Sequence, residues 1–131
     1  MTFVRFHAAT ANARGTFPGL FALANGLASD GLLSEVDVAW LRRANDDAAA
    51  AYADPAITHP EVYDRALNPR AAAWFRASAT DLVSMTQGYL DLLTRYGVDW
   101  VESRSDDPGR VIYSDDVQVI VVPHVRQSPV E

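Results

Sequence analysis

The most informative stretch of the chain is residues 80–97, which read TDLVSMTQGYLDLLTRYG. Its polar positions and one glycine share a single stripe with steps of three or four residues: Asp81, Ser84, Gly88, Asp91 and Arg95. Most of the other positions are apolar, so a helix here exposes one narrow face and buries most of the rest. Gly97 is a typical C-terminal stop. The pattern predicts a mostly buried central helix.

Gly88 lies in the interior of this predicted helix, where glycine costs about 1 kcal/mol relative to alanine. We interpret it as a point of close packing against another element. Whether residues 70–79 continue the helix or form a separate one stays open. This short region contains Trp74 and Phe75. Two adjacent aromatic residues on a helix cannot both face the core, so we expect one of them to contact a partner.

A second helix is predicted over residues 34–52. Ser34 begins a capping-box pattern, with Asp37 in the place of the usual glutamate. Apolar residues then recur at helical spacing until Asp54-Pro55 ends the helix. A shorter helix is predicted near residues 20–27. The proline-rich residues 54–69 are expected to form a loop with one helical turn at Glu61–Leu67.

Strands are predicted at both ends of the chain. Residues 2–8 alternate in polarity, which indicates a first strand. After Gly97, three β-type segments are separated by turn signals: Val98–Arg104, Arg110–Ser114 and Val117–Val122. We expect them to form a three-strand antiparallel meander that the first strand joins. The last of them is apolar on both faces, which indicates a central strand or an interface.

The predicted fold class is therefore α+β, with three to four helices packed on a small, mainly antiparallel sheet. We expect residues 1–124 to form one such domain and residues 125–131 to form a disordered tail.

The composition of the 131 residues excludes several kinds of chemistry. The chain has no cysteine and no lysine, since all eleven basic residues are arginine. Thiolate metal sites, cysteine nucleophiles and Schiff-base lysines are therefore absent. The alanine-rich, lysine-free style is typical of high-GC bacteria. The lack of cysteine suits a cytoplasmic protein.

A formal net charge of −6 argues against nucleic-acid binding, because coating phosphates requires a basic face. The sequence has no apolar run long enough to span a membrane and no signal-peptide pattern. We therefore expect an acidic, soluble protein with no nucleic-acid or membrane partner. No motif indicates a metal or a cofactor, and we expect neither.

Four polar side chains are candidate catalytic residues, provided that the fold brings them together: His7, His59, His124 and Asp64. If the first and last strands were neighbours, His7 and His124 would lie near one rim of the sheet. The candidate ligand-binding residues are Arg5 and Tyr63. Arg5 and His7 are expected on the same face of the first strand, where such a pair can bind an anion. Tyr63 belongs to the middle loop.

Serine nucleophiles lack support from the sequence. No Gly-x-Ser-x-Gly elbow is present, and Ser78, Ser84 and Ser103 have no identifiable base. The sequence leaves open whether the chain is an enzyme.

Two main hypotheses for the function follow, and a purely structural subunit of a larger assembly is a third reading. The first is a small interaction protein, such as an inhibitor, immunity or accessory factor, that binds another protein or a second copy of itself. Its support is the acidic charge, the apolar last strand and the pair Trp74-Phe75. The alternative is a small enzyme or ligand-binding protein. Its site of histidine, arginine and aspartate side chains would lie between the sheet and the middle loop.

Overall fold

The computed structural model describes residues 1–124, and the tail expected at 125–131 lies outside this range. The described chain has an α+β fold, as predicted. The strands form one sheet: β1 (Phe3–Ala8), β2 (Ala72–Arg76), β3 (Trp100–Ser105), β4 (Arg110–Ser114) and β5 (Gln118–Val122). The helices are α1 (Leu20–Ser29), α2 (Glu35–Ala51), α3 (Pro55–Thr58) and α4 (Thr80–Arg95), with a 3-10 turn η1 (Pro60–Tyr63).

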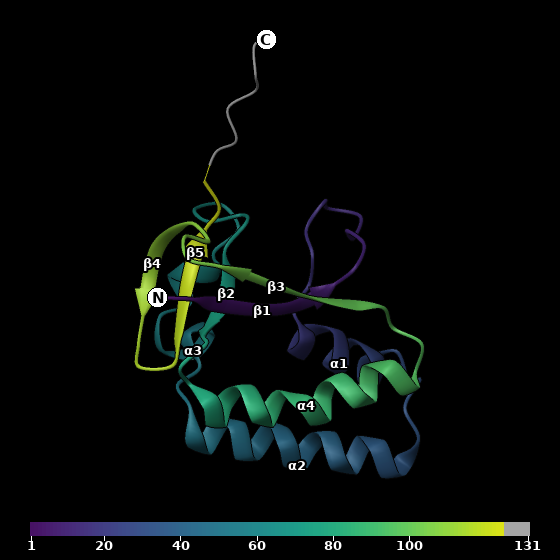
Figure 1. Ribbon diagram of the computed structural model, residues 1–131. Helices are drawn as coiled ribbons and strands as arrows, with labels where there is room; N and C mark the ends of the chain where they lie inside the picture. Colours follow the sequence, from purple (N-terminus) through teal and green to yellow (C-terminus); the bar gives the residue numbers. More distant parts are fainter. Residues whose placement is uncertain (125–131) are drawn as a thin grey trace.

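The sheet is antiparallel throughout and has the order β3-β1-β2-β5-β4 (Figure 1). The prediction that the first strand joins the sheet is confirmed, and β5 is central as its apolar sequence indicated. The predicted three-strand meander is wrong, because β3 pairs with β1 and only β4 and β5 form a hairpin. Turn residues indicate where a strand ends, but they do not determine which strands pair. Here β3 pairs along the whole of β1, and Trp100 meets Phe6 edge-on at 6.1 Å.

Residues 72–76 form a strand, whereas the sequence suggested a helix for residues 70–79. The run of three alanines at residues 71–73 favours a helix locally, but β2 lies between β1 and β5 and pairs with both. In a strand, adjacent side chains point to opposite faces. Phe75 is accordingly buried in the core at 5% exposure, and Trp74 lies on the other face, half-buried.

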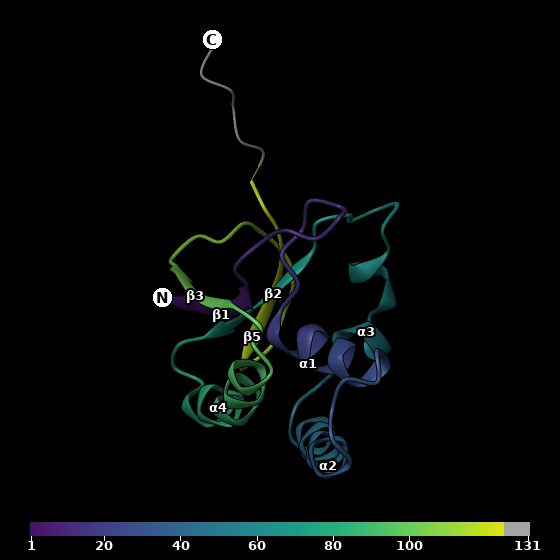
Figure 2. The ribbon, with the colours of Figure 1, turned by 90° about the vertical axis from the view of Figure 1, so that its right-hand side faces the viewer.

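The helices cover one face of the sheet. Helices α4 and α1 lie against the sheet, and α2 packs on their far side (Figures 1 and 2). The prediction that α4 is mostly buried is confirmed, since its large apolar side chains are sealed from solvent: Tyr89, Leu90, Leu92 and Leu93. Its predicted polar positions Asp81, Asp91 and Arg95 are exposed.

Gly88 is the point where α2 and α4 approach closely. A Cβ atom at this position would lie 2.6 Å from Cζ2 of Trp40. The interpretation of Gly88 as a packing glycine is therefore confirmed. Helix α2 begins as the capping pattern indicated, with the Asp37 N–H donating to Ser34 Oγ at 3.2 Å.

The middle segment, defined here as residues 54–69, links α2 to β2. The helical turn expected at Glu61–Leu67 is found only over residues 61–63, within η1. A second turn, α3, precedes it, because Asp54 caps α3 and a proline begins each short helix. Val62 anchors the segment at 3% exposure. Among the described residues, no helix combines the length and apolar character needed to cross a membrane.

Candidate functional site

Polar side chains gather along β1 and β3 on the sheet face opposite the long helices, and we call this part of the face the open face. Along β1, Val4, Phe6 and Ala8 are buried, so Arg5 and His7 lie on the open face, as their alternation predicts. The ladder with β3 pairs Arg5 with Ser103. Since directly paired residues share a face, Ser103 joins this group.

His7 is held by both ring nitrogens. Its Nδ1 lies 2.9 Å from the carbonyl oxygen of Ala8, and its Nε2 lies 2.7 Å from Ser103 Oγ. A carbonyl oxygen only accepts, so we assign the ring proton to Nδ1. In the neutral ring, Nε2 then accepts the proton of the Ser103 hydroxyl. The ring of Phe17 meets the imidazole edge-on at 5.8 Å.

The Arg5 side chain lies where β2 diverges from β1. Strand β2 pairs with β1 only at Phe3 and Val4, and further along Gly19 forms a bridge with His7 instead. The Arg5 guanidinium spans the gap, donating from Nη1 to the Ala73 carbonyl at 3.0 Å and from Nη2 to the Phe17 carbonyl at 2.6 Å. Both acceptors are neutral. Burial lowers the pKa of Arg5, and no carboxylate within residues 1–124 forms an ion pair with it.

Tyr63 brings the middle segment close to this cation. Burial raises the pKa of the Tyr63 hydroxyl, and the positive charge of Arg5 acts in the opposite direction. The charge of Arg5, on β1, therefore affects the pKa of Tyr63, in the middle segment, so the two proposed ligand-binding residues interact. Asp64 has a different place, because its Oδ1 accepts the N–H groups of Ala66 and Leu67 and stabilises a turn.

The histidines have separate surroundings. The Nδ1 of His59 lies 2.9 Å from Thr58 Oγ1, and its ring packs on Tyr113 at 5.0 Å. The Nε2 of His124 lies 2.7 Å from Asp107 Oδ1. Strand β2 separates β1 from β5, so the fold does not make His7 and His124 neighbours. Across residues 1–124, no three histidine, aspartate or glutamate side chains group as metal ligands would.

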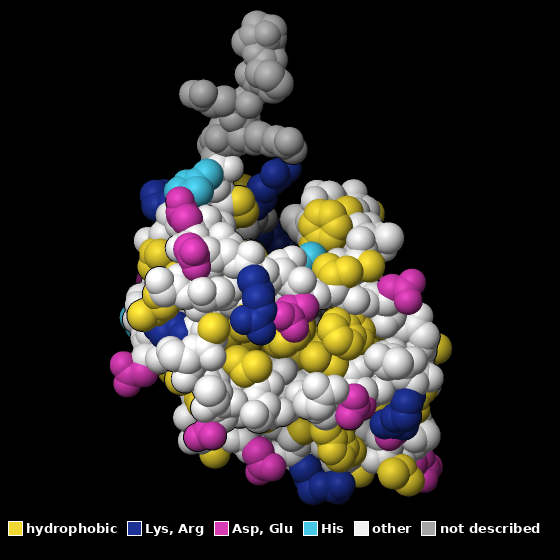
Figure 3. Space-filling model, in the orientation of Figure 1, with side chains coloured by type: hydrophobic (Ala, Val, Ile, Leu, Met, Phe, Trp, Pro, Cys, Tyr) yellow, Lys and Arg dark blue, Asp and Glu magenta, His cyan; other side chains and the backbone are white. Residues whose placement is uncertain are grey.

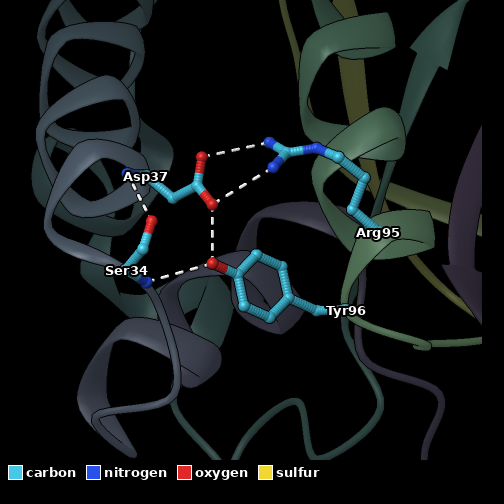
Figure 4. Close-up of polar contacts among 4 residues, drawn as sticks. All are labelled: Ser34, Asp37, Arg95 and Tyr96. Atoms are coloured by element: carbon cyan, nitrogen blue, oxygen red, sulfur yellow. Dashed lines mark hydrogen bonds and ion pairs between the residues drawn. The ribbon is translucent and has the colours of Figure 1, made fainter.

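A second polar cluster joins the start of α2 to the end of α4 (Figure 4). Asp37 accepts hydrogen bonds from Arg95, at 3.1 and 3.2 Å, and from the Tyr96 hydroxyl at 2.6 Å. That hydroxyl also accepts the N–H of Ser34. Hydrogen bonds from Arg95 and Tyr96 lower the pKa of Asp37 to about 2. An acid at a helix start and a base at a helix end both complement the helix dipoles, so this cluster stabilises the packing of α2 on α4.

Sequence reasoning missed two of these arrangements. Ser103 had no identifiable base, and the fold supplies His7 from a strand 96 positions away. The link between Asp37 and Arg95 left a weak signal, which is an acid in the first turn of one helix and a base in the last turn of the other.

Comparison of the chain with protein-family models, curated proteins and solved structures found no match. The function must therefore be inferred from the chemistry of its own residues.

Proposed function

We propose that the protein acts by binding another protein through the middle segment. The observation that carries this proposal is a set of apolar side chains that the middle segment leaves in solvent. Ile57 is 78% exposed, Leu67 is 68% exposed and Tyr63 is 38% exposed. Burying an aliphatic side chain completely is worth about 1.5–3 kcal/mol, so a partner that covers Ile57 and Leu67 gains substantial affinity.

The middle segment is built to present these side chains. A long connection without long helices or strands is usually functional when it is ordered. Here α3 and η1 pack on each other, and the buried side chains of Pro55 and Val62 hold the segment in place. Less conformational entropy is then lost when a partner binds.

Charge indicates the kind of partner. The middle segment carries Asp54, Glu61 and Asp64 against Arg65, and the whole chain has a formal net charge of −6. A partner with an apolar patch and a basic rim would complement the middle segment. On the opposite side of the molecule, which Figure 3 shows, acidic side chains are also scattered among apolar ones.

The edges of the sheet are less suitable for binding. Edge strand β3 carries an ion pair between Glu102 and Arg104 at 2.6 Å, and edge strand β4 has a register shift between Val111 and Tyr113. Charged side chains and bulges are devices that oppose the addition of a further strand. Self-association through a sheet edge is therefore the less favoured form of the proposal.

The test compares complexes purified from the natural host. Native mass spectrometry of the wild-type chain should show a second protein or a second copy. The double variant Ile57→Asp/Leu67→Asp should lose it. Leu32→Asp is a matched control, since Leu32 is 60% exposed but lies between α1 and α2. A wild-type chain without a partner, or a partner retained by the double variant, would contradict the proposal.

A second candidate function, a small enzyme or ligand-binding protein, is favoured by the arrangement around Arg5. A half-buried guanidinium whose hydrogen-bonding partners are two neutral carbonyls attracts an anion. Inorganic phosphate is a suitable probe. Amide NMR shifts should saturate with phosphate in the wild type and in Arg42→Lys, a surface control. They should not saturate in Arg5→Lys, which keeps the charge but loses the planar fork. Equal binding by Arg5→Lys would rule out this site.

A further inference from the structure

We propose that Ser103 and His7 form a nucleophile–base pair that accepts an acyl group from a small ester. The inference starts from the hydrogen bond between Ser103 Oγ and His7 Nε2, at 2.7 Å. This distance lies within the range in which an imidazole can remove a hydroxyl proton. It rests on the second candidate function, a small enzyme, but its test is independent of the phosphate test above because it requires no partner protein and no anion.

A third group orients the base. His7 Nδ1–H donates to the Ala8 carbonyl oxygen at 2.9 Å, which fixes the tautomer that leaves Nε2 free to accept. In nucleophilic enzymes a third group commonly holds the base in this way, often a carboxylate. The neutral carbonyl would stabilise the imidazolium less than a carboxylate does, so we expect slow turnover.

The pair is also well positioned by the fold. The two side chains come from adjacent strands, and pairing extends along all six residues of β1. Groups held on regular strands keep their geometry better than groups on loops. His7 and Ser103 are half-buried, so a small substrate can still reach them, and the Phe17 ring covers one edge of the imidazole.

The proposed reaction balances without a cofactor. Ser103 Oγ attacks the ester carbonyl carbon while its proton passes to His7 Nε2. The bond from the carbonyl carbon to the leaving oxygen then breaks, and the imidazolium gives its proton to that oxygen. An acyl ester of Ser103 remains. Water attacks this ester with His7 again as the base, and the products are a carboxylic acid, an alcohol and the free serine.

The chain is well suited to a direct test. It has no lysine and no cysteine, so the usual competing acyl acceptors are missing. The full-length protein is incubated with p-nitrophenyl acetate, and the acetylated fraction is followed by intact mass and peptide mapping. We expect one acetyl group on Ser103. Hydroxylamine should remove this ester, whereas an amide on the N-terminal amine would persist.

Three variants separate the proposal from incidental acetylation. Ser103→Ala should lose the label. His7→Gln can still hydrogen bond but is not a base, so acylation should slow by about 100-fold or more. Ser105→Ala should react at the wild-type rate. Ser105 lies two residues further along β3, on the same face, and its hydroxyl accepts the N–H of Asp107, whereas the Ser103 hydroxyl is bonded to His7.

Circular dichroism establishes that each variant is folded, and His7→Asn replaces His7→Gln if the latter does not fold. Acetylation at a residue other than Ser103 would overturn the proposal. So would a wild-type rate equal to that of Ser103→Ala, or an unchanged rate in the folded His7 variant.

Discussion

Replacing Gly88 by alanine tests how α2 packs on α4. The added Cβ would lie 2.6 Å from Cζ2 of Trp40 and 3.1 Å from Cη2. Carbon atoms in favourable contact are about 3.5–4.0 Å apart, so the indole would have to withdraw by roughly 1 Å. Its ring meets the ring of the fully buried Tyr89 at 5.4 Å, so the half-buried indole must move toward solvent and give up part of its packing.

The expected effect is a balance of two terms. Overpacking a well-packed interface costs about 1–3 kcal/mol. Alanine regains about 1 kcal/mol of helix propensity relative to glycine. Gly88→Ala should therefore change the free energy of unfolding by between about zero and a loss of about 2 kcal/mol. Gly26→Ala is the matched control, since Gly26 is inside α1 and nothing lies within 4 Å of its added Cβ. It should gain about 0.5–1 kcal/mol.

Because both variants gain helix propensity, the difference between them isolates the clash with Trp40. Urea unfolding followed by circular dichroism should separate their free energies of unfolding by about 1–3 kcal/mol. In a Trp40→Leu background the clash is removed, so the same alanine should become as favourable as at Gly26. If Gly88→Ala stabilised the wild-type protein as much as Gly26→Ala, the packing of α2 on α4 would be refuted.

Two further predictions concern pH. Hydrogen bonds from Arg95 and Tyr96 lower the folded-state pKa of Asp37 to about 2, so its contribution to stability is complete above pH of about 4 and is lost as pH falls toward 2. Asp37→Asn should flatten this acid limb of the melting temperature, whereas Glu35→Gln in the same helical turn should not. Burial raises the pKa of Tyr89 in the folded state to about 12. The stability that its protonated hydroxyl contributes is therefore complete below pH of about 10 and is lost as pH rises toward 12. Absorbance titration of Tyr89→Phe should lack one late-titrating tyrosine, and an unchanged titration curve would contradict this prediction.

The two long helices could be predicted because their information is local. The stripe in residues 80–97 specifies the buried side of α4, and Ser34 specifies the start of α2. Gly88 was unusual enough in its context to indicate close packing. Its partner Trp40 could not be identified from the sequence, because the contact depends on how the helices cross.

Strand β2 could not be predicted, because its sequence favours a different structure when taken alone. Its alanines suit a helix, and the strand forms because β1 and β5 provide backbone partners on both sides. The predicted meander was wrong for a similar reason. Pairing of β3 with β1 is a contact between distant parts of the chain, which turn residues do not report.

In the candidate site too, local features could be predicted from the sequence and tertiary contacts could not. Alternation along β1 was sufficient to place Arg5 and His7 on one face. The influence of Arg5 on Tyr63 depends on the path of the middle segment, and the partner of His7 depends on the pairing of β3. Both are tertiary facts that a local pattern does not contain.

The register of β1 and β3 determines the core and the Ser103–His7 pair together. A slip of one residue would turn Val4 and Phe6 toward the open face, because side chains alternate with a period of two. Each of these buried side chains is worth about 1.5–3 kcal/mol, so such a slip is strongly disfavoured. The strand register that brings Ser103 and His7 together is therefore as persistent as the core itself. Removing the half-buried Ser103 hydroxyl leaves Val4 and Phe6 in place, so Ser103→Ala should report on the chemistry of the pair rather than on folding.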